Sequence, residues 1–359
     1  ITILTILFNQ SILYILSSEI IMRNKQKSIL SILLAIIFLF NITACSKEPS
    51  HTETLTNPTS NAETTAISVA VLKGPTGIGA VKLMDSTDSS NEYTFEVSSA
   101  PDEVMAKLIN GSVDIAALPT NVAAAVYNKS EQEISIAAIN TLGVLHILER
   151  GNTIQSVSDL EGKTIYATGQ GSTPEYVLNY ILQKNNIQNV TVEYMAEHAE
   201  LATALLAGDV NIALLPEPNV TAVLLKDSTI HQALDLTEEW NTTQLTNSLM
   251  PSQLAMGCIV ARKDFIQNNT DAFENFLKEY EESVNYVNNN VSEVAELVQK
   301  YGIMDSAAVA EKAIPNCNIV FIANDEMKNA LQGFYQILFE ANPKSIGGAL
   351  PNEDFYYTK

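Results

Sequence analysis

Arginine is scarce in this sequence: Arg23, Arg150 and Arg262 are the only ones in 359 residues. Acidic residues number 41 against 20 basic ones, which gives a formal net charge of −21. Nucleic-acid binding needs clustered lysine and arginine, so the charge argues against a nucleic-acid partner. The planar guanidinium is also the usual clamp for sulfonate and phosphate groups. The lack of arginine therefore weakens a dedicated oxyanion site, and the substrate stays open.

Residues for catalysis and metal binding are also few. The four histidines show no metal-ligand spacing, and no Cys-x-x-Cys is present, so we expect no metal and no cofactor. The stretch "GPTGIGAV" has phosphate-loop glycine spacing but offers Ala80-Val81 where lysine and serine or threonine are needed. Ser172 or Thr173 would need a base to act as a nucleophile, and none is near in sequence. We expect a binding protein that is not an enzyme.

The N-terminal region carries an export signal. From Met22 the chain reads as a basic segment, an apolar run and then Ile-Thr-Ala-Cys, which is typical of a lipoprotein signal (22–44) with lipidation at Cys45. An uncleaved membrane anchor is the alternative, although the run is short for one. Residues 1–21 are interpreted as a non-native leader, or else as a second apolar segment. Residues 45–65, which lack aromatics, predict a flexible tether. This places the protein on the extracytoplasmic face of the membrane.

The other two cysteines leave two possibilities open. An exported protein is in an oxidising setting, so Cys258 and Cys317 are a possible disulfide. Cys258 lies in an apolar run, however, where a free buried thiol is common.

A repeat organises the rest of the chain. Short β-rich runs alternate with helical stretches, and 108–120 shares seven of thirteen residues with 205–217, including a Leu-Pro pair in each. Alternating strands and helices predict mostly parallel sheets flanked by helices, and ligands of such sheets bind beyond the carboxyl ends of the strands. The fold class is therefore α/β with two lobes, unless the likeness is a coincidence of common β-loop-α sequences.

Two apolar runs outside the repeat, 143–150 and 256–263, are predicted to be the strands that cross between the lobes. The predicted organisation is a first part of lobe 1 at 66–146, lobe 2 at 147–257, and a return to lobe 1 with C-terminal helices at 258–359. Two connections make a hinge with restricted motion.

A family resemblance rests on the order of several motifs: the lipobox at Cys45, "LINGSVDIA", "DLEGKTI" (159–165), "LLAGDVNIA" and the pair Glu217-Pro218. The sequence resembles the substrate-binding lipoproteins of ABC importers, in the group that serves nitrate, alkanesulfonates, taurine and thiamine precursors. It lacks the cysteine-rich stretch of the similar thiamine-precursor synthases. The resemblance implies a type 2 periplasmic-binding-protein fold and a monomer that delivers a small polar molecule to permease and ATPase subunits. An extracellular sensor of the same fold is the alternative.

Ligand contacts are predicted at two Gly-rich turns, Lys73–Gly79 and Gly169–Thr173. They are also predicted just after the two Leu-Pro pairs of the repeat, which we call the Leu-Pro corners. Both turns lie between a strand and a helix, where free backbone N–H groups and the positive helix end suit an anionic or polar group. The glycines can instead serve only the turns. Glu217 would favour an amine or ring N–H, with Lys73 for an anion, unless Glu217 only starts a helix. The predicted ligand-binding residues are Lys73, Gly74, Thr76, Gly77, Thr120, Asn121, Thr141, Gly169, Gln170, Gly171, Ser172, Thr173, Glu217 and Asn219.

Overall fold

The computed structural model describes residues 65–247 and 252–359, which lie in one compact unit, Ala62–Lys359. The predicted leader, signal peptide, lipidated Cys45 and tether up to residue 64 are outside the described residues. Within the described part of the chain, no helix has both the length and the apolar character needed to cross a membrane.

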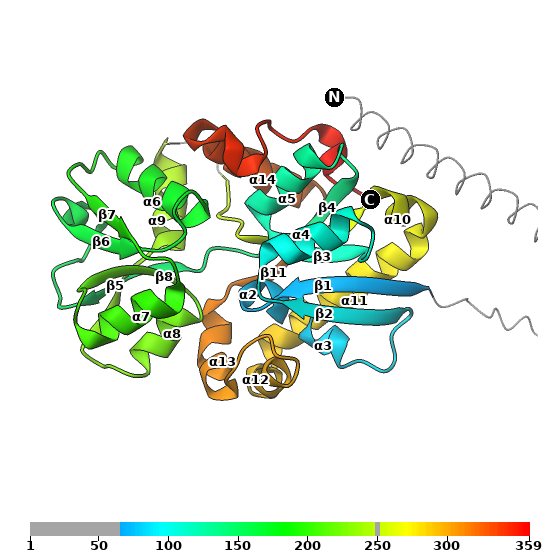
Figure 1. The fold of residues 1–359 in the computed structure, drawn as a ribbon, viewed down its shortest axis with the longest axis horizontal. Coiled ribbons are helices and arrows are strands. Elements are labelled where there is room, and N and C mark those ends of the chain that lie inside the picture. The colour runs from blue at the N-terminus through cyan, green and yellow to red at the C-terminus, as the bar shows by residue number, and fades with distance from the viewer. Residues whose placement is uncertain (1–64, 248–251) are drawn as a thin grey trace, which may run out of the picture. The chain divides into compact units, whose positions relative to one another are not determined.

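Two β-sheets form the framework (Figure 1). The six-stranded sheet, in spatial order, consists of β11 (Ile319–Ala323), β4 (Ile134–Thr141), β10 (Gly257–Arg262), β3 (Ile115–Pro119), β1 (Ala66–Leu72) and β2 (Glu92–Ser98). The five-stranded sheet consists of β7 (Thr191–Tyr194), β6 (Thr164–Ala167), β8 (Ile212–Pro216), β5 (Leu145–Arg150) and β9 (Ile230–Asp235). We call the first sheet with its helices lobe 1 and the second lobe 2. The predicted two-sheet α/β class is confirmed.

The sheets are mixed rather than mostly parallel. β1 pairs in parallel with β2 and β3, and β6 with β7 and β8. The two runs predicted to cross between lobes, β5 and β10, are antiparallel to both of their neighbours. Because ladder hydrogen bonds on two sides hold each run in a single sheet, neither is itself a crossing strand. The chain leaves lobe 1 through residues 142–144. It returns through residues 252–256, just before β10.

Helices cover both faces of each sheet (Figure 1). One face of both sheets carries α4 (Pro101–Ile109), α5 (Thr120–Lys129), α6 (Thr173–Lys184), α9 (Leu236–Asn247) and α14 (Asn324–Ala341). The other face of lobe 1 carries α2 (Pro75–Ile78), α3 (Val81–Met84), α10 (Lys263–Asn268), α11 (Thr270–Asn289), α12 (Val291–Lys300) and α13 (Ala307–Ala313). The other face of lobe 2 carries α7 (His198–Ala207) and α8 (Asn219–Leu224). Short 3-10 turns are η1 (Val157–Leu160), η2 (Ile314–Asn316), η3 (Pro343–Ile346) and η4 (Glu353–Phe355).

The sequence repeat forms the same structure twice. α4 leads to Gly111 and β3, and α7 leads to Gly208 and β8, with both glycines in the left-handed region at φ 77° and 81°. A residue in this conformation allows hydrogen bonds to the last carbonyls of the helix. Residues other than glycine adopt the conformation only with strain. The arginines of the two lobes occupy matching places: Arg150 donates to the Leu205 carbonyl, and a Cβ on Gly111 would meet the Arg262 guanidinium. The repeat in the sequence is therefore also a repeat in the structure.

The helical stretch that follows the first Gly-rich turn is broken into α2 and α3. Ser283 of α11 is the cause: its hydroxyl donates to the Gly79 carbonyl at 2.6 Å and accepts from the Leu83 amide at 3.2 Å. These two groups would otherwise bond to each other as an i to i−4 pair. An inserted side chain of this kind interrupts a helix.

The possible disulfide between Cys258 and Cys317 is not formed; both are free, buried thiols. Cys258 belongs to the hydrophobic cluster under α5 and α14, whereas Cys317 belongs to the cluster under α11 and α12. Because the two clusters pack on opposite faces of the six-stranded sheet, the thiols are held apart. Burial raises the pKa of both thiols.

Candidate ligand-binding site

A pocket of about 760 Å³ lies between the two sheets, at the carboxyl ends of β1, β3 and β8. Both lobes contribute to its wall, as expected for ligand sites beyond the carboxyl ends of strands. Six of the predicted ligand-binding residues line it: Lys73, Gly74, Thr76, Thr141, Glu217 and Asn219.

The first-lobe side begins with the turn after β1. Gly74 takes φ 84° and its N–H donates to the Ile303 carbonyl at 3.0 Å, so this amide is not free for an anion. Lys73 Nζ lies 3.8 Å from Asp305 Oδ1 and its side chain is half exposed. Asn140, buried under the turn, donates to the Thr76 carbonyl at 2.9 Å. Since α2 has only four residues, the expected helix-end field here is small.

The second-lobe side is the Leu-Pro corner after β8. The Glu217 amide donates to the Val144 carbonyl of the crossing segment at 2.9 Å, which fixes the corner to the connection between the lobes. The Glu217 side chain is 2% exposed. Its carboxylate accepts from the Thr221 amide at 3.1 Å and from the Thr221 hydroxyl at 2.9 Å. Glu217 therefore caps the first turn of α8 and also lines the pocket, while its role in ligand choice stays a prediction.

His198, the first residue of α7, also lines the pocket and was missed from the sequence. Its Nδ1 lies 2.5 Å from the Thr168 hydroxyl, and burial lowers the pKa of the imidazole, so the neutral ring is favoured. A signal was present in the sequence, because the β7–α7 junction connects a strand to a helix just as the two Gly-rich turns after β1 and β6 do.

A further stretch of the wall comes from distant parts of lobe 1. Met256 stands just before β10, and the loop after α12 brings Ile303, Met304, Asp305 and Ser306. No local motif marks this loop as functional, because its position depends on how α12 and α13 pack on the first lobe. Met256, Ile303 and Met304 add thioether and aliphatic surface to the pocket, whereas Asp305 and Ser306 add polar groups.

Several predicted residues lie elsewhere. Gly77 is needed for packing, since a Cβ there would stand 2.1 Å from the Leu72 carbonyl oxygen. Thr120 is 1% exposed and its hydroxyl faces the Cys258 thiol. Asn121, the next residue of α5, does not line the pocket either.

The second Gly-rich turn, Gly169–Thr173, is also outside this pocket. Ser172 Oγ donates to the Gly169 carbonyl at 2.6 Å, and the Gly171 amide donates to Glu175 Oε2 at 2.6 Å. Tyr176 donates its hydroxyl to the Gly171 carbonyl and accepts from Asn342, just beyond α14 of lobe 1, both at 2.9 Å. In this arrangement the turn, with Gln170 at its exposed tip, bonds to its own lobe and to the end of α14. Ligand contact at this turn stays a prediction.

The two sides of the lobe junction differ. On one side a single apolar cluster runs through both lobes, and Trp240 of α9 packs edge-on against Phe334 of α14 with ring centroids 5.8 Å apart. On the pocket side the clusters of the two lobes are separate. The lobes therefore share a packed apolar core on one side, whereas on the other side they surround the pocket and touch where α13 meets α8.

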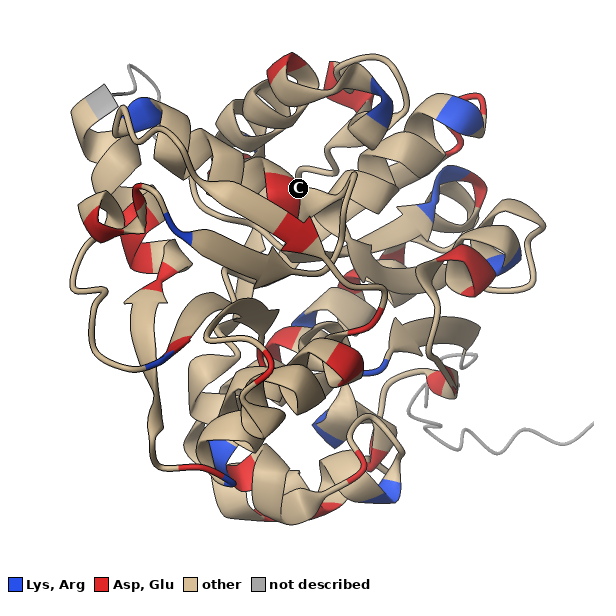
Figure 2. Cartoon of the chain, turned by 60° about the vertical axis from the view of Figure 1, so that its left-hand side comes forward, with Lys and Arg blue, Asp and Glu red and all other residues tan. Residues whose placement is uncertain are grey.

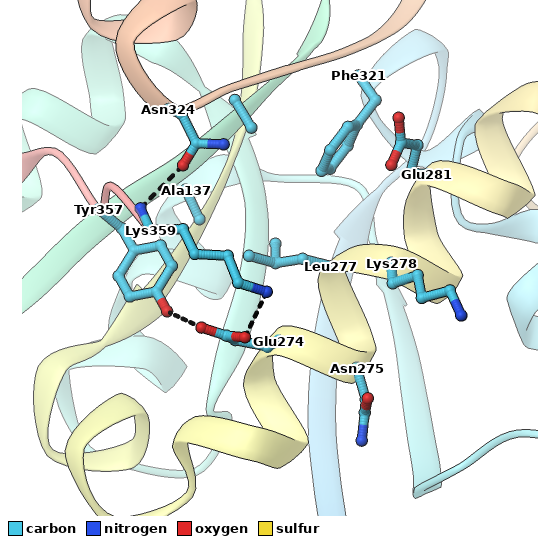
Figure 3. A pocket seen from close by; sticks show the side chains of 11 residues that line it. Ala137, Glu274, Asn275, Leu277, Lys278, Glu281, Phe321, Asn324, Tyr357 and Lys359 are labelled. Carbon is cyan, nitrogen blue, oxygen red and sulfur yellow. Dashed lines mark hydrogen bonds and ion pairs between the residues drawn. The ribbon is translucent and has the colours of Figure 1, made fainter.

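A second, smaller pocket of about 330 Å³ lies beside α11 and β11 of lobe 1 (Figure 3). Glu274 is engaged there: it accepts from the Tyr357 hydroxyl at 3.2 Å and pairs with Lys359 Nζ at 2.5 Å. The Lys359 amide donates to Asn324 Oδ1 at 2.9 Å. Only one lobe builds this pocket.

Acidic residues are spread over the helices and loops of both lobes (Figure 2). Across 65–247 and 252–359 no group of three or more His, Cys, Asp and Glu side chains is placed to hold a metal ion.

Comparison with known proteins now adds to the geometry. The family model described as NMT1/THI5 like matches residues 101–294, more than half of the 359 residues. The chain belongs to the NMT1/THI5-like family. The suspected relationship from the sequence is confirmed, and the matched range covers lobe 2 and much of lobe 1. The sequence matches no curated protein.

Solved structures resemble this NMT1/THI5-like chain over most of its length. An ABC transporter from Parabacteroides distasonis has 28% identity and a TM-score of 0.70, covering 82% of this chain and 99% of its own. The periplasmic aliphatic sulphonate binding protein SsuA from Escherichia coli has 18% identity and a TM-score of 0.64, covering 82% and 92%. The alkanesulfonate-binding protein SsuA from Xanthomonas axonopodis pv. citri, bound to MOPS, has 16% identity and a TM-score of 0.56, covering 78% and 94%. The two SsuA proteins show the fold, which is that of type 2 periplasmic binding proteins.

Proposed function

We propose that this protein is the solute-binding component of an ABC importer, which captures a small molecule between its two lobes and delivers it to a membrane permease with its ATPase. The observation that carries the proposal is the 760 Å³ pocket whose wall comes from the strand ends of both sheets. Family membership and the likeness to an ABC transporter structure over 99% of that chain support it. The proposal includes no chemical step on the solute, and it treats the protein as a monomer.

The asymmetric junction between the lobes supports a closing motion. A ligand that touches both walls favours the closed arrangement by its extra contacts. The continuous core at Trp240 and Phe334 provides the fixed side of such a motion, and the pocket lies on the side where the cores are separate. Residues 142–144 and the segment before β10 would carry the rotation.

Mass spectrometry tests the proposal most simply. The full chain is purified from membranes in detergent without refolding, and its bound small molecules are released and identified. We expect one compound at close to one equivalent per chain. A protein that carries no compound, and takes up none from a metabolite extract, would contradict the proposal.

Lipid anchoring at Cys45 is part of the same proposal. The basic segment, apolar run and Ile-Thr-Ala-Cys order support it, and an anchored tether keeps the binding lobes near a permease. We predict that Cys45→Ser releases the protein into the medium or leaves an unprocessed precursor, measured by fractionation and intact mass. Membrane retention at the mature size in Cys45→Ser would contradict the lipid anchor.

A further inference from the structure

The Glu217 carboxylate is buried in the pocket wall without a counter-charge. In the described residues, no lysine, arginine or histidine nitrogen lies within ion-pair distance of it. Its partners are neutral: the Thr221 amide and hydroxyl, and the Asn316 side chain. Burial raises the pKa of the Glu217 carboxyl above its usual value, and the hydrogen bonds only partly oppose that effect.

The other charged groups of the same pocket are at its mouth or are already paired. Lys73 stands beside Asp305, whose side chain is 95% exposed, and Lys226 is exposed beyond α8. His198 is bonded to Thr168, and Cys317 is the titratable neighbour behind Glu217. Arg150 forms an ion pair with Asp227, and Arg262 forms one with Asp264. Neither arginine lines the pocket. Among the groups that line the pocket, Glu217 is therefore the buried acid, the lysines are exposed, and His198 is a neutral imidazole bonded to Thr168.

An ionised carboxylate held in a low-dielectric wall without a partner is costly, and a cation placed beside it recovers that cost. An oxyanion at the same place would be repelled and would find no guanidinium to hold it. The rest of the wall, with Met256, Met304 and Val309 and four prolines, suits the apolar body of a small organic molecule.

We propose that Glu217 is the specificity-determining residue of this pocket and that it selects a small organic cation, with a protonated nitrogen beside the carboxylate, in place of a sulfonate or nitrate. This inference rests on the proposed solute-binding function. It distinguishes the chain from the sulfonate-binding proteins that share its fold, because the expected ligand is a cation whereas a sulfonate is an anion.

The test uses a deproteinised yeast extract divided by ion exchange at neutral pH into basic, acidic and unretained fractions. Each fraction is added to the full-length protein in detergent, and the thermal unfolding midpoint is measured. Binding to the folded state raises the midpoint, and we expect a rise of about 2 °C or more with the basic fraction alone. Glu217→Gln, which keeps the shape and the acceptor oxygen, should lose most of that rise. Glu200→Gln, an exposed carboxylate on α7 outside the pocket, is the matched control and should keep it.

The outcomes are distinct. A rise with the acidic or unretained fraction, or an equal response in Glu217→Gln and wild type, overturns the cation assignment while the binding function stands. No rise with any fraction or with the whole extract removes the proposed function and the assignment together. If Glu217→Gln does not fold, the choice of fraction by the wild-type protein decides, and Glu217→Asp, which keeps the charge, should retain the preference for the basic fraction.

Discussion

The two copies of the repeat follow the same backbone path but differ in what their side chains meet. In the first copy Thr120, after the Leu-Pro pair, is buried against Cys258. In the second copy Glu217, the counterpart of Thr120, lines the pocket. The identical residues of the repeat build the corner, whereas the residues that differ place Thr120 in the core and Glu217 in the pocket wall.

The largest expected difference between the lobes lies outside the repeat, between Gly77 inside α2 of lobe 1 and Gly171 in the turn before α6 of lobe 2. Gly77→Ala would place a Cβ 2.1 Å from a backbone oxygen that cannot move without disturbing β1, so we expect a loss of about 3 kcal/mol in the free energy of unfolding. Gly171→Ala meets no atom within 4 Å and has only the strain of φ 74°, about 1 kcal/mol. Urea unfolding of both variants measures the two losses in the free energy of unfolding. Equal losses would contradict the difference between the packed Gly77 and the open Gly171.

A smaller difference is expected at the threonines beside the corners. Thr221→Val removes the hydroxyl that donates to Glu217 at 2.9 Å in a buried site, which should cost about 1 kcal/mol. Thr120→Val exchanges a hydroxyl that faces only a thiol, and should change stability by about 0.5 kcal/mol or less. Denaturant midpoints of the two variants give the comparison, and a larger loss for Thr120→Val would reverse it.

The smallest effect concerns Arg150, the arginine of lobe 2. Hydrogen bonds from Thr229, and then from Arg150, lower the pKa of Asp227 to about 2. Because the folded-state pKa is below the unfolded value, this group adds stability above the unfolded pKa of about 3.9, which is lost as pH falls through about 2. In Arg150→Gln the pKa of Asp227 should rise, though it should stay below 3.9 because the Thr229 bonds remain. A carboxyl NMR titration measures both values, and an unchanged pKa in Arg150→Gln would show that the arginine does not contribute.

The sequence predicted the elements of the repeat well because their signals are local. β1, β3, β6 and β8 and the helices α4, α6 and α7 follow from apolar runs bounded by glycine or proline. The strand β4 beside the edge strand β11, the antiparallel direction of β5 and β10, and the break between α2 and α3 depend on partners far along the chain, such as Ser283 beside Gly79. Local patterns carry no information on such contacts.

The candidate site was predicted in part for the same reason. Lys73, Gly74 and Glu217 stand at strand ends that the repeat makes visible. His198 had the same type of signal at β7, but the loop from Ile303 to Ser306 reaches the pocket only through the packing of α12 and α13. The predicted turn at Gly169–Thr173 has the expected sequence, yet Tyr176 and Glu175 take up its polar groups.

A crystal structure of the protein with the compound that it captures would test the central claim most directly. We expect the compound in the pocket between the sheets, in contact with the turn after β1 on one side and with Glu217 on the other. A compound bound beside α11 and β11, or held by one lobe alone, would contradict the account of a solute captured between two lobes.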